Sequence, residues 1–251
     1  MTALPVVALH AFPLNHHLWD AQAESLRAAG HEVLTPDLPG FGGTAVPDVE
    51  PNLDVFAASV LAAMDAAGYD RVILGGLSMG GYTAMALLRL APERVAALVL
   101  ADTRSAADTP EGAAARLATA SQVESIGDTR AFARAMIPTL VGPSTLADRP
   151  EVVDLVRGWI EANHPAGIAW ALRAMAARPD SAATLSAFTG PALIIWGEED
   201  TLTNRADQEP MIDALADVEL AIIPGAGHLT AVESPEAVTG VLLDFVTAQK
   251  G

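Results

Sequence analysis

Two kinds of segment alternate along this chain of 251 residues, and the alternation limits its fold more than any other feature. Short apolar runs bounded by Gly, Pro or Asp indicate buried strands, and they cover residues 4–9, 33–35, 71–74, 95–100, 192–196 and 218–223. Segments of helical periodicity cover residues 20–29, 54–67, 80–90 and 235–248. Strands that are apolar throughout and separated by helices are typical of a parallel sheet with helices on both faces. The sequence therefore predicts an α/β fold with about six parallel strands, whose ligands bind at the carboxyl ends of the strands.

The alternation is interrupted once, between Asp102 and about Ser186, where Ala, Arg and acidic residues recur at helical spacing. Turn signals at residues 142–144, 163–165 and 178–180 divide this stretch, so that about four short helices would fit. We predict a core domain of residues 1–102 and 187–251, with residues 103–186 inserted after the fourth core strand as a helical lid (cap).

Composition excludes several classes of function. Charged, Pro or Gly residues interrupt every apolar run before the roughly 20 residues that a membrane span needs, and the N-terminus lacks the features of a signal peptide. We therefore expect a cytoplasmic protein with no membrane partner. The absence of cysteine excludes disulfides, thiolate catalysis and zinc–thiolate sites. A net charge of −17 disfavours a nucleic-acid partner, and neither cofactor nor metal is expected.

The sequence Gly76-Leu77-Ser78-Met79-Gly80 joins an expected strand to an expected helix. A serine on such a sharp turn has a strained backbone, and the two glycines leave room for the bend. The helix that follows directs free N–H groups at an anion beside the hydroxyl, with the Met79 N–H as the expected donor. Ser78 is therefore the candidate nucleophile.

A serine nucleophile needs a base and a carboxylate, in the chain order serine, acid, histidine. His228 lies in a loop of small residues after the last expected strand, and it is the candidate base. Asp200 follows the fifth expected strand and is the candidate acid, while Glu198, Glu199 and Asp102 are alternatives. Asp102 could equally cap a helix or act at the hinge of the insertion. His10, at the end of the first expected strand, is expected to fix a loop by hydrogen bonds.

These features resemble the α/β-hydrolase superfamily over nearly the whole chain outside the insertion. Leu9-His10-Ala11-Phe12-Pro13 is similar to the family's His-Gly segment, a match that implies the Phe12 N–H as second oxyanion donor. Ala11 stands where the family usually has Gly, and Leu14 is the alternative donor because Pro13 has no N–H. Residues 37–44 are similar to the family's D-x-P-G-x-G-x-S/T turn. The two antiparallel strands with which many members begin are missing, which leaves a wholly parallel sheet.

The resemblance is closest to small bacterial carboxylesterases and to enol-lactonases of the 3-oxoadipate type. It implies a serine hydrolase that cleaves small carboxylic esters through an acyl-enzyme. A lactonase, or a perhydrolase or C–C bond hydrolase with the same triad, is the alternative. A more distant one is a non-catalytic receptor or interaction protein of the same fold.

The insertion contains side chains that would set the substrate. An enol-lactone diacid would need a cation near the site, for which the candidates are Arg104, Arg130, Arg134 and Arg173. Apolar residues could build an acyl pocket. These are Phe12, Phe132, Met136, Trp159 and Trp170.

Overall fold

The computed structural model describes residues 3–249, and within them six strands form one sheet. All neighbouring strands are parallel, in the order β2-β1-β3-β4-β5-β6. The strands are β1 (Val6–Leu9), β2 (Val33–Leu34), β3 (Val72–Leu77), β4 (Val95–Ala101), β5 (Ala192–Gly197) and β6 (Val218–Ile223). The predicted six-stranded, wholly parallel sheet is therefore confirmed.

The position of each strand in the sheet explains its composition. β1, β3 and β4 lie inside the sheet, and every residue of these strands is buried, which is why their sequences are apolar without alternation. β2 and β6 are the edge strands and remain partly exposed, so β6 tolerates Glu219. The register pairs Gly76 of β3 with Leu9 of β1 and with Leu100 of β4. The carboxyl ends of these strands therefore lie at one edge.

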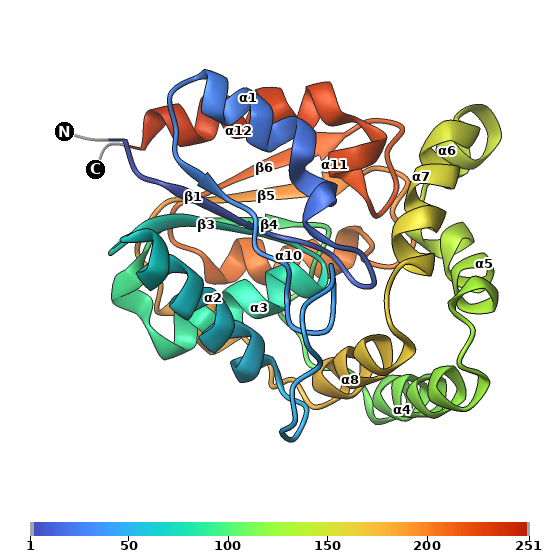
Figure 1. Ribbon diagram of the computed structural model, residues 1–251. Coiled ribbons are helices and arrows are strands. Elements are labelled where there is room, and N and C mark those ends of the chain that lie inside the picture. The colour runs from blue at the N-terminus through green and yellow to red at the C-terminus, as the bar shows by residue number, and fades with distance from the viewer. Residues whose placement is uncertain (1–2, 250–251) are drawn as a thin grey trace.

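Helices cover both faces of the sheet (Figure 1). α1 (Asp20–Ala28) and α12 (Pro235–Ala248) lie on one face, and α2 (Leu53–Ala67), α3 (Met79–Leu90) and α10 (Arg205–Ala214) on the other. α10 was not predicted, because Pro210 lies inside it and few of its residues are apolar. Its start does carry a local signal, a capping box in which the Asn204 and Asp207 side chains bind each other's backbone N–H groups.

Between β4 and β5 the chain forms more helices than the four or so expected. They are α4 (Pro110–Ile126), α5 (Thr129–Leu140), α6 (Pro143–Asp148), α7 (Pro150–Glu161), α8 (Pro165–Ala176) and α9 (Ala182–Ser186). The difference arises because Pro143 and Pro150 each begin a separate short helix. α4 and α8 pack against each other, and α4–α8 lie beyond the carboxyl ends of the strands (Figure 1).

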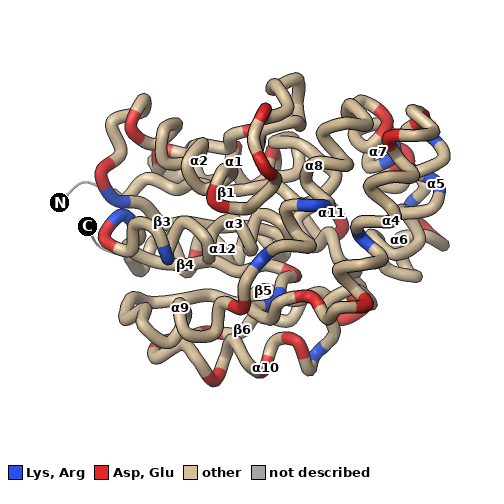
Figure 2. Tube along the Cα trace, turned by 90° about the horizontal axis from the view of Figure 1, so that it is seen from below, with Lys and Arg blue, Asp and Glu red and all other residues tan. Residues whose placement is uncertain are grey.

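Acidic residues are spread along the molecule, from the end that carries the termini to helices α5 and α7 (Figure 2). This distribution fits the net charge of −17. None of the helices in residues 3–249 has the length and hydrophobicity that crossing a bilayer requires.

Candidate active site

Ser78 lies at a sharp turn between β3 and α3. Its backbone has φ 55° and ψ −112°, a conformation that side chains other than glycine rarely adopt. The turn brings backbones so close that a Cβ on Gly76 would lie 2.2 Å from the Gly80 carbonyl carbon. A Cβ on Gly80 would lie 2.2 Å from the Leu9 carbonyl oxygen of β1. Both glycines are therefore required by the packing of α3 against the sheet.

Ser78, His228 and Asp200 form one continuous series of hydrogen bonds. The Ser78 hydroxyl lies 2.8 Å from His228 Nε2, and His228 Nδ1 lies 2.8 Å from Asp200 Oδ2. His228 and Asp200 are buried, at 3% and 5% exposure. With Nδ1 carrying the proton, the imidazole donates to Asp200 and Nε2 can accept the serine proton. The three residues that the sequence singled out thus lie in contact.

The loop after β5 holds the Asp200 carboxylate in place. The N–H groups of Leu202 and Thr203 donate to Oδ1, at 2.8 and 3.1 Å, and the Thr203 hydroxyl donates to Oδ2. Burial alone would raise the pKa of Asp200, but the charge on His228 and the hydrogen bonds from His228 and Thr203 hold that pKa below its ordinary value. Asp200 is therefore ionised near neutral pH and oriented toward the imidazole.

Asp102, the alternative acid, binds other partners. Its Oδ1 accepts from the Gly197 N–H at 2.9 Å, and its Oδ2 lies 2.5 Å from the Thr230 hydroxyl. Asp102 therefore connects the end of β4 to the end of β5 and to the start of α11 (Thr230–Glu233). Complete burial, and then repulsion from Asp200, raise the pKa of Asp102 well above its ordinary value.

The two glutamates that precede Asp200 make no contact with the imidazole. Glu198 is exposed. Glu199 accepts from the N–H of Ser144, at 2.9 Å, and from its hydroxyl, so it fixes the first turn of α6. Neither glutamate therefore takes the place of Asp200 beside His228.

His10 fixes a loop, as its place at the end of the first strand predicts. Its Nε2 accepts from the Leu38 N–H at 3.0 Å, which leaves Nδ1 to donate to the Ala11 carbonyl at 3.0 Å. Complete burial lowers the pKa of His10 to about 4, so the ring is neutral near pH 7.

The backbone N–H groups of the two expected oxyanion donors have no hydrogen-bond acceptor in the described chain. Neither the Phe12 N–H nor the Met79 N–H donates to another group of the described chain, whereas the Leu14 N–H donates to the Ala11 carbonyl at 2.9 Å. Leu14, the alternative donor, is therefore occupied. Ala11 does not have a left-handed backbone, so its conformation is compatible with a Cβ.

The carboxylate of Glu233 joins the histidine loop to the insertion, and sequence reasoning did not find it. Oε1 accepts from the Leu229 N–H at 2.9 Å, next to His228. Oε2 accepts from the Gly142 N–H and the Thr145 hydroxyl, both at 2.7 Å. The side chain is buried, with three bonds to two segments that are 84 or more residues apart in the chain. No local pattern signals such a contact.

A cavity of about 220 Å³ contains Ser78 and His228. Helices α4, α5 and α8 supply much of its wall. The apolar lining comprises Phe12, Ala115, Phe132, Met136, Leu140, Leu172, Met175 and Leu202. Trp159 and Trp170, two of the expected pocket residues, lie elsewhere: Trp159 stacks on His17, and Trp170 packs on Phe56.

Two arginines line the cavity, Arg104 and Arg116. Arg104 was one of the four cation candidates, and Arg116 was missed because its helical spacing in α4 resembles that of an ordinary surface residue. Arg130 and Arg134 are exposed on α5, and Arg173 forms a bidentate ion pair with Glu124, at 2.6 and 2.7 Å.

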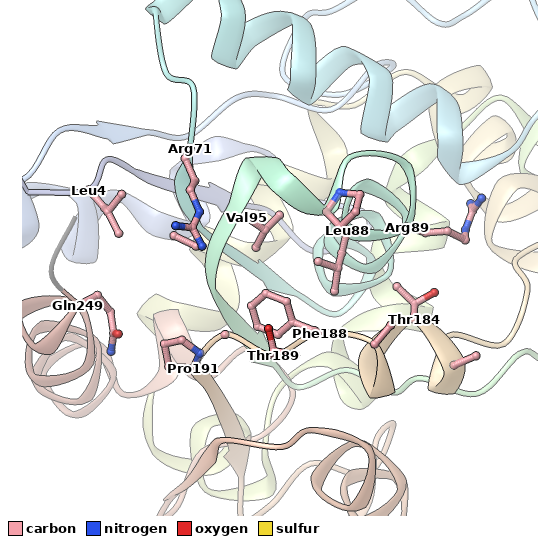
Figure 3. A pocket seen from close by; sticks show the side chains of 15 residues that line it. Leu4, Arg71, Leu88, Arg89, Val95, Thr184, Phe188, Thr189, Pro191 and Gln249 are labelled. Carbon is pink, nitrogen blue, oxygen red and sulfur yellow. The ribbon is translucent and has the colours of Figure 1, made fainter.

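A larger cavity, of about 690 Å³, lies at the opposite edge of the sheet (Figure 3). It is lined at the amino ends of strands by Leu4, Arg71, Val95 and Pro191. No histidine or serine is among the described residues that line it. The larger cavity therefore has no nucleophile and base of the kind found at Ser78. In residues 3–249, no cluster of His and carboxylate side chains could hold a metal ion.

Comparison with known proteins identifies the family. The family described as alpha/beta hydrolase fold matches residues 5–235. The pimeloyl-[acyl-carrier protein] methyl ester esterase of Aromatoleum aromaticum is 30% identical, over 96% of this chain and 97% of its own. The 3-oxoadipate enol-lactonase 2 of Acinetobacter baylyi is 28% identical, over 82% of this chain and 74% of its own. The structure of a thermophilic esterase from Thermogutta terrifontis with malate bound has a TM-score of 0.93 and 36% identity. That match covers 98% of this chain and 90% of the esterase.

The chain therefore belongs to the α/β-hydrolase-fold family, and the resemblance drawn from its motifs is confirmed. The expectation that it is a hydrolase of that family is confirmed by the esterases and the enol-lactonase among its relatives.

Proposed function

We propose that this protein is a serine hydrolase that cleaves small carboxylic esters, with Ser78 as nucleophile, His228 as base and Asp200 as acid. The observation that carries the proposal is the unbroken series of hydrogen bonds from the Ser78 hydroxyl through His228 to Asp200. The esterases among its relatives support ester bonds as the target.

The reaction follows from this geometry. His228 Nε2 removes the Ser78 proton while Oγ forms a bond to the ester carbonyl carbon, and the N–H groups of Met79 and Phe12 stabilise the oxyanion. The C–O bond to the alcohol then breaks, and the alcohol leaves with the proton from His228. Water gives a proton to His228 and bonds to the acyl carbon, after which the acid leaves and Ser78 regains its proton. Asp200 stabilises the imidazolium at each step.

Residues 103–186 act in this proposal as a lid domain on the core of residues 1–102 and 187–251. Wall residues of the Ser78 cavity that belong to α4, α5 and α8 support this role, because they limit what can reach the hydroxyl. The lid would also reduce the access of water to the ester.

A lactone is the second candidate substrate. Attack on a lactone uses the same nucleophile and oxyanion donors, and the enol-lactonase from Acinetobacter baylyi supports it. Perhydrolysis and C–C bond hydrolysis use the same groups, so a substrate panel must separate them. A non-catalytic receptor of this fold would have no need for the hydrogen bonds that connect Ser78, His228 and Asp200.

Hydrolysis of p-nitrophenyl esters from acetate to decanoate, together with a set of small lactones, tests the proposal. We expect Ser78→Ala to lower kcat by a factor of about a thousand or more without changing the thermal unfolding curve. A fall of less than tenfold would remove Ser78 from the role of nucleophile.

A fluorophosphonate probe supplies a second readout. It should label the wild type at Ser78 and leave Ser78→Ala unlabelled. No labelling and no turnover with any substrate would favour a non-catalytic protein of this fold.

A further inference from the structure

The cavity at Ser78 has an unusual charge for this chain. The sequence contains 31 Asp and Glu residues against 14 Lys and Arg residues. Yet two guanidinium groups, those of Arg104 and Arg116, line the cavity, and no carboxylate is among its described lining residues. The local charge is thus opposite to that of the molecule as a whole.

Arg104 is only partly satisfied by the protein. Its Nη2 donates to the Leu202 carbonyl at 2.6 Å, while its contact with Asp207 Oδ1 is 3.5 Å. The Asp207 carboxylate is also used to cap α10. The Nε–H of Arg104 is buried and has no partner in the described residues. Arg104 therefore has N–H groups that the protein does not bind, and its side chain lines the cavity.

Arg116 shares its carboxylate with another cation. Its Nε donates to Asp108 Oδ2 at 2.6 Å, and Arg178 lies 2.8 Å from Asp108 Oδ1. The Nη1 of Arg116 reaches the sulfur of Met175 at 3.8 Å, a weak acceptor. Three guanidinium groups, of Arg104, Arg116 and Arg178, thus face two carboxylates, of Asp108 and Asp207. Among these five groups one positive charge is in excess, and Arg104 and Arg116 line the cavity. The ionised Asp200 is bound by His228, Leu202 and Thr203 and does not itself line the cavity.

An excess guanidinium beside an apolar wall and a nucleophile is suited to a ligand with one anionic end. Guanidinium binds carboxylate through paired, charge-assisted hydrogen bonds. The side chains of Phe132, Met136 and Leu172 would contact a methylene chain. A cavity of about 220 Å³ admits only a short one.

We propose that the substrate carries a free carboxylate in addition to the bond that is cleaved, and that Arg104 and Arg116 bind this carboxylate. The substrate class is therefore the half-esters of short dicarboxylic acids and the lactones that bear a carboxylate. The inference rests on the proposed function, since it names the substrate of the same site.

The test compares two esters that differ in charge and have similar shape. Ethyl hydrogen glutarate carries the carboxylate, and ethyl 5-methylhexanoate has an isopropyl group in its place. Acid release in a pH-stat gives kcat and KM for both. We expect the wild type to hydrolyse the half-ester with a kcat/KM at least tenfold higher.

Single substitutions should weaken the charged substrate more than the neutral one. Arg104→Gln and Arg116→Gln should each raise KM for the half-ester about tenfold, as the loss of a charge-assisted hydrogen bond predicts, and lower the ratio of kcat/KM between the half-ester and the neutral ester by about the same factor. Arg173→Gln, whose guanidinium binds Glu124 outside the cavity, is the matched control and should behave like the wild type for both esters.

Binding of glutarate, measured by calorimetry, needs no turnover and separates the two proposals. The wild type is compared with a variant that carries both Arg104→Gln and Arg116→Gln. Binding of glutarate to the wild type but not to this double variant supports the carboxylate site. If no ester is cleaved in that case, only the proposed function fails. If esters are hydrolysed through Ser78 but the wild type prefers the neutral ester, the carboxylate site is wrong. An equal fall in kcat/KM for the half-ester and the neutral ester, in either Arg104→Gln or Arg116→Gln, also contradicts the carboxylate site.

Discussion

At the scale of single residues, two buried aspartates at the ends of neighbouring strands have opposite environments. Asp200 faces His228, and its pKa is lowered, whereas Asp102 faces Gly197 and Thr230, and its pKa is raised. The two carboxylates therefore differ in role: Asp200 is ionised beside His228, and Asp102 connects the end of β4 to the end of β5 and the start of α11.

Asparagine at each position distinguishes these roles. We expect Asp200→Asn to lower kcat by a factor of about a thousand or more, because the amide cannot stabilise the imidazolium. Asp102→Asn should keep kcat within a few-fold of wild type. Steady-state kinetics on one ester measures both, and a larger loss in Asp102→Asn would transfer the acid role to Asp102.

Asp102→Asn should also change how the free energy of unfolding depends on pH. Because the pKa of Asp102 is raised on folding, the folded state retains this proton at a pH at which the unfolded chain has lost it. The contribution of Asp102 to stability therefore falls as pH rises above about 4. Asparagine does not titrate, so Asp102→Asn removes this pH-dependent loss of stability. Urea unfolding at pH 7 should therefore show a free energy of unfolding for Asp102→Asn that is no lower than that of the wild type. A clear decrease would mean that a charged Asp102 is needed.

His10 should make the protein less stable in mild acid. Its pKa is about 4 in the folded state and 6.5 ordinarily, so the unfolded chain takes up a proton first as the pH falls. The His10 contribution is complete above pH 6.5 and is lost as the pH falls toward 4. Between pH 6.5 and about pH 5.5 the loss amounts to roughly 1 kcal/mol.

Comparison with His10→Gln isolates this effect, since the Gln oxygen can accept from the Leu38 N–H but does not titrate. Urea denaturation at the two pH values should show a steeper decrease in the wild type. Equal slopes in the two proteins would contradict the pKa assignment.

At the scale of elements, Glu233 at the end of α11 joins the histidine loop to α6. Glu233→Gln replaces one acceptor oxygen by an NH2 group and leaves a buried N–H without a partner. We expect the free energy of unfolding to fall by about 2 kcal/mol, and kcat to fall several-fold because Leu229 adjoins His228. Denaturant unfolding and ester kinetics measure the two effects.

Glu199→Gln is the matched control for Glu233→Gln. Glu199 also binds the first turn of α6, through Ser144, but only its backbone N–H, and not its carboxylate, forms a hydrogen bond with the histidine loop, at the Ala226 carbonyl. Its substitution should therefore leave kcat close to wild type. An equal fall in kcat for both variants would show that anchoring α6, rather than Leu229, is what supports His228.

The close packing of backbones explains why this edge of the sheet is rich in glycine. A Cβ on Gly227 would lie 2.1 Å from the Gly142 nitrogen, and a Cβ on Gly197 would lie 2.1 Å from the Gly227 carbonyl oxygen. The end of β5, the histidine loop and the start of α6 are thus in direct backbone contact. The insertion is fixed to the core at α6, next to His228.

At the scale of the whole molecule, charge is distributed unevenly between surface and cavity. Acidic residues are spread throughout the molecule (Figure 2), whereas arginines line the cavity at Ser78. The negative surface repels polyanions such as nucleic acid, while the cavity favours a small anion that can reach the two guanidinium groups. The expected cytoplasmic location stays a prediction.

The sequence by itself determined the sheet, the strand-to-helix turn at Ser78 and the choice of His228. Each depends on local chemistry: apolar runs mark buried strands, Gly76 and Gly80 permit a tight turn, and a loop of small residues leaves room for an imidazole at the end of a strand. α10 and the division of the insertion into short helices were not predicted, because their apolar pattern is weak or broken by proline.

Only the tertiary structure decided which side chains meet. It brought Asp200 rather than Asp102 to the imidazole, directed Arg116 and not Arg134 at the cavity, and brought Glu233 to Gly142. These contacts join elements that are 28 or more residues apart, and they depend on how the helices pack above the sheet. The spacing of residues within one segment predicts whether that segment forms a helix or a strand. It does not predict how the segment packs against the others, and so it does not predict which side chains meet.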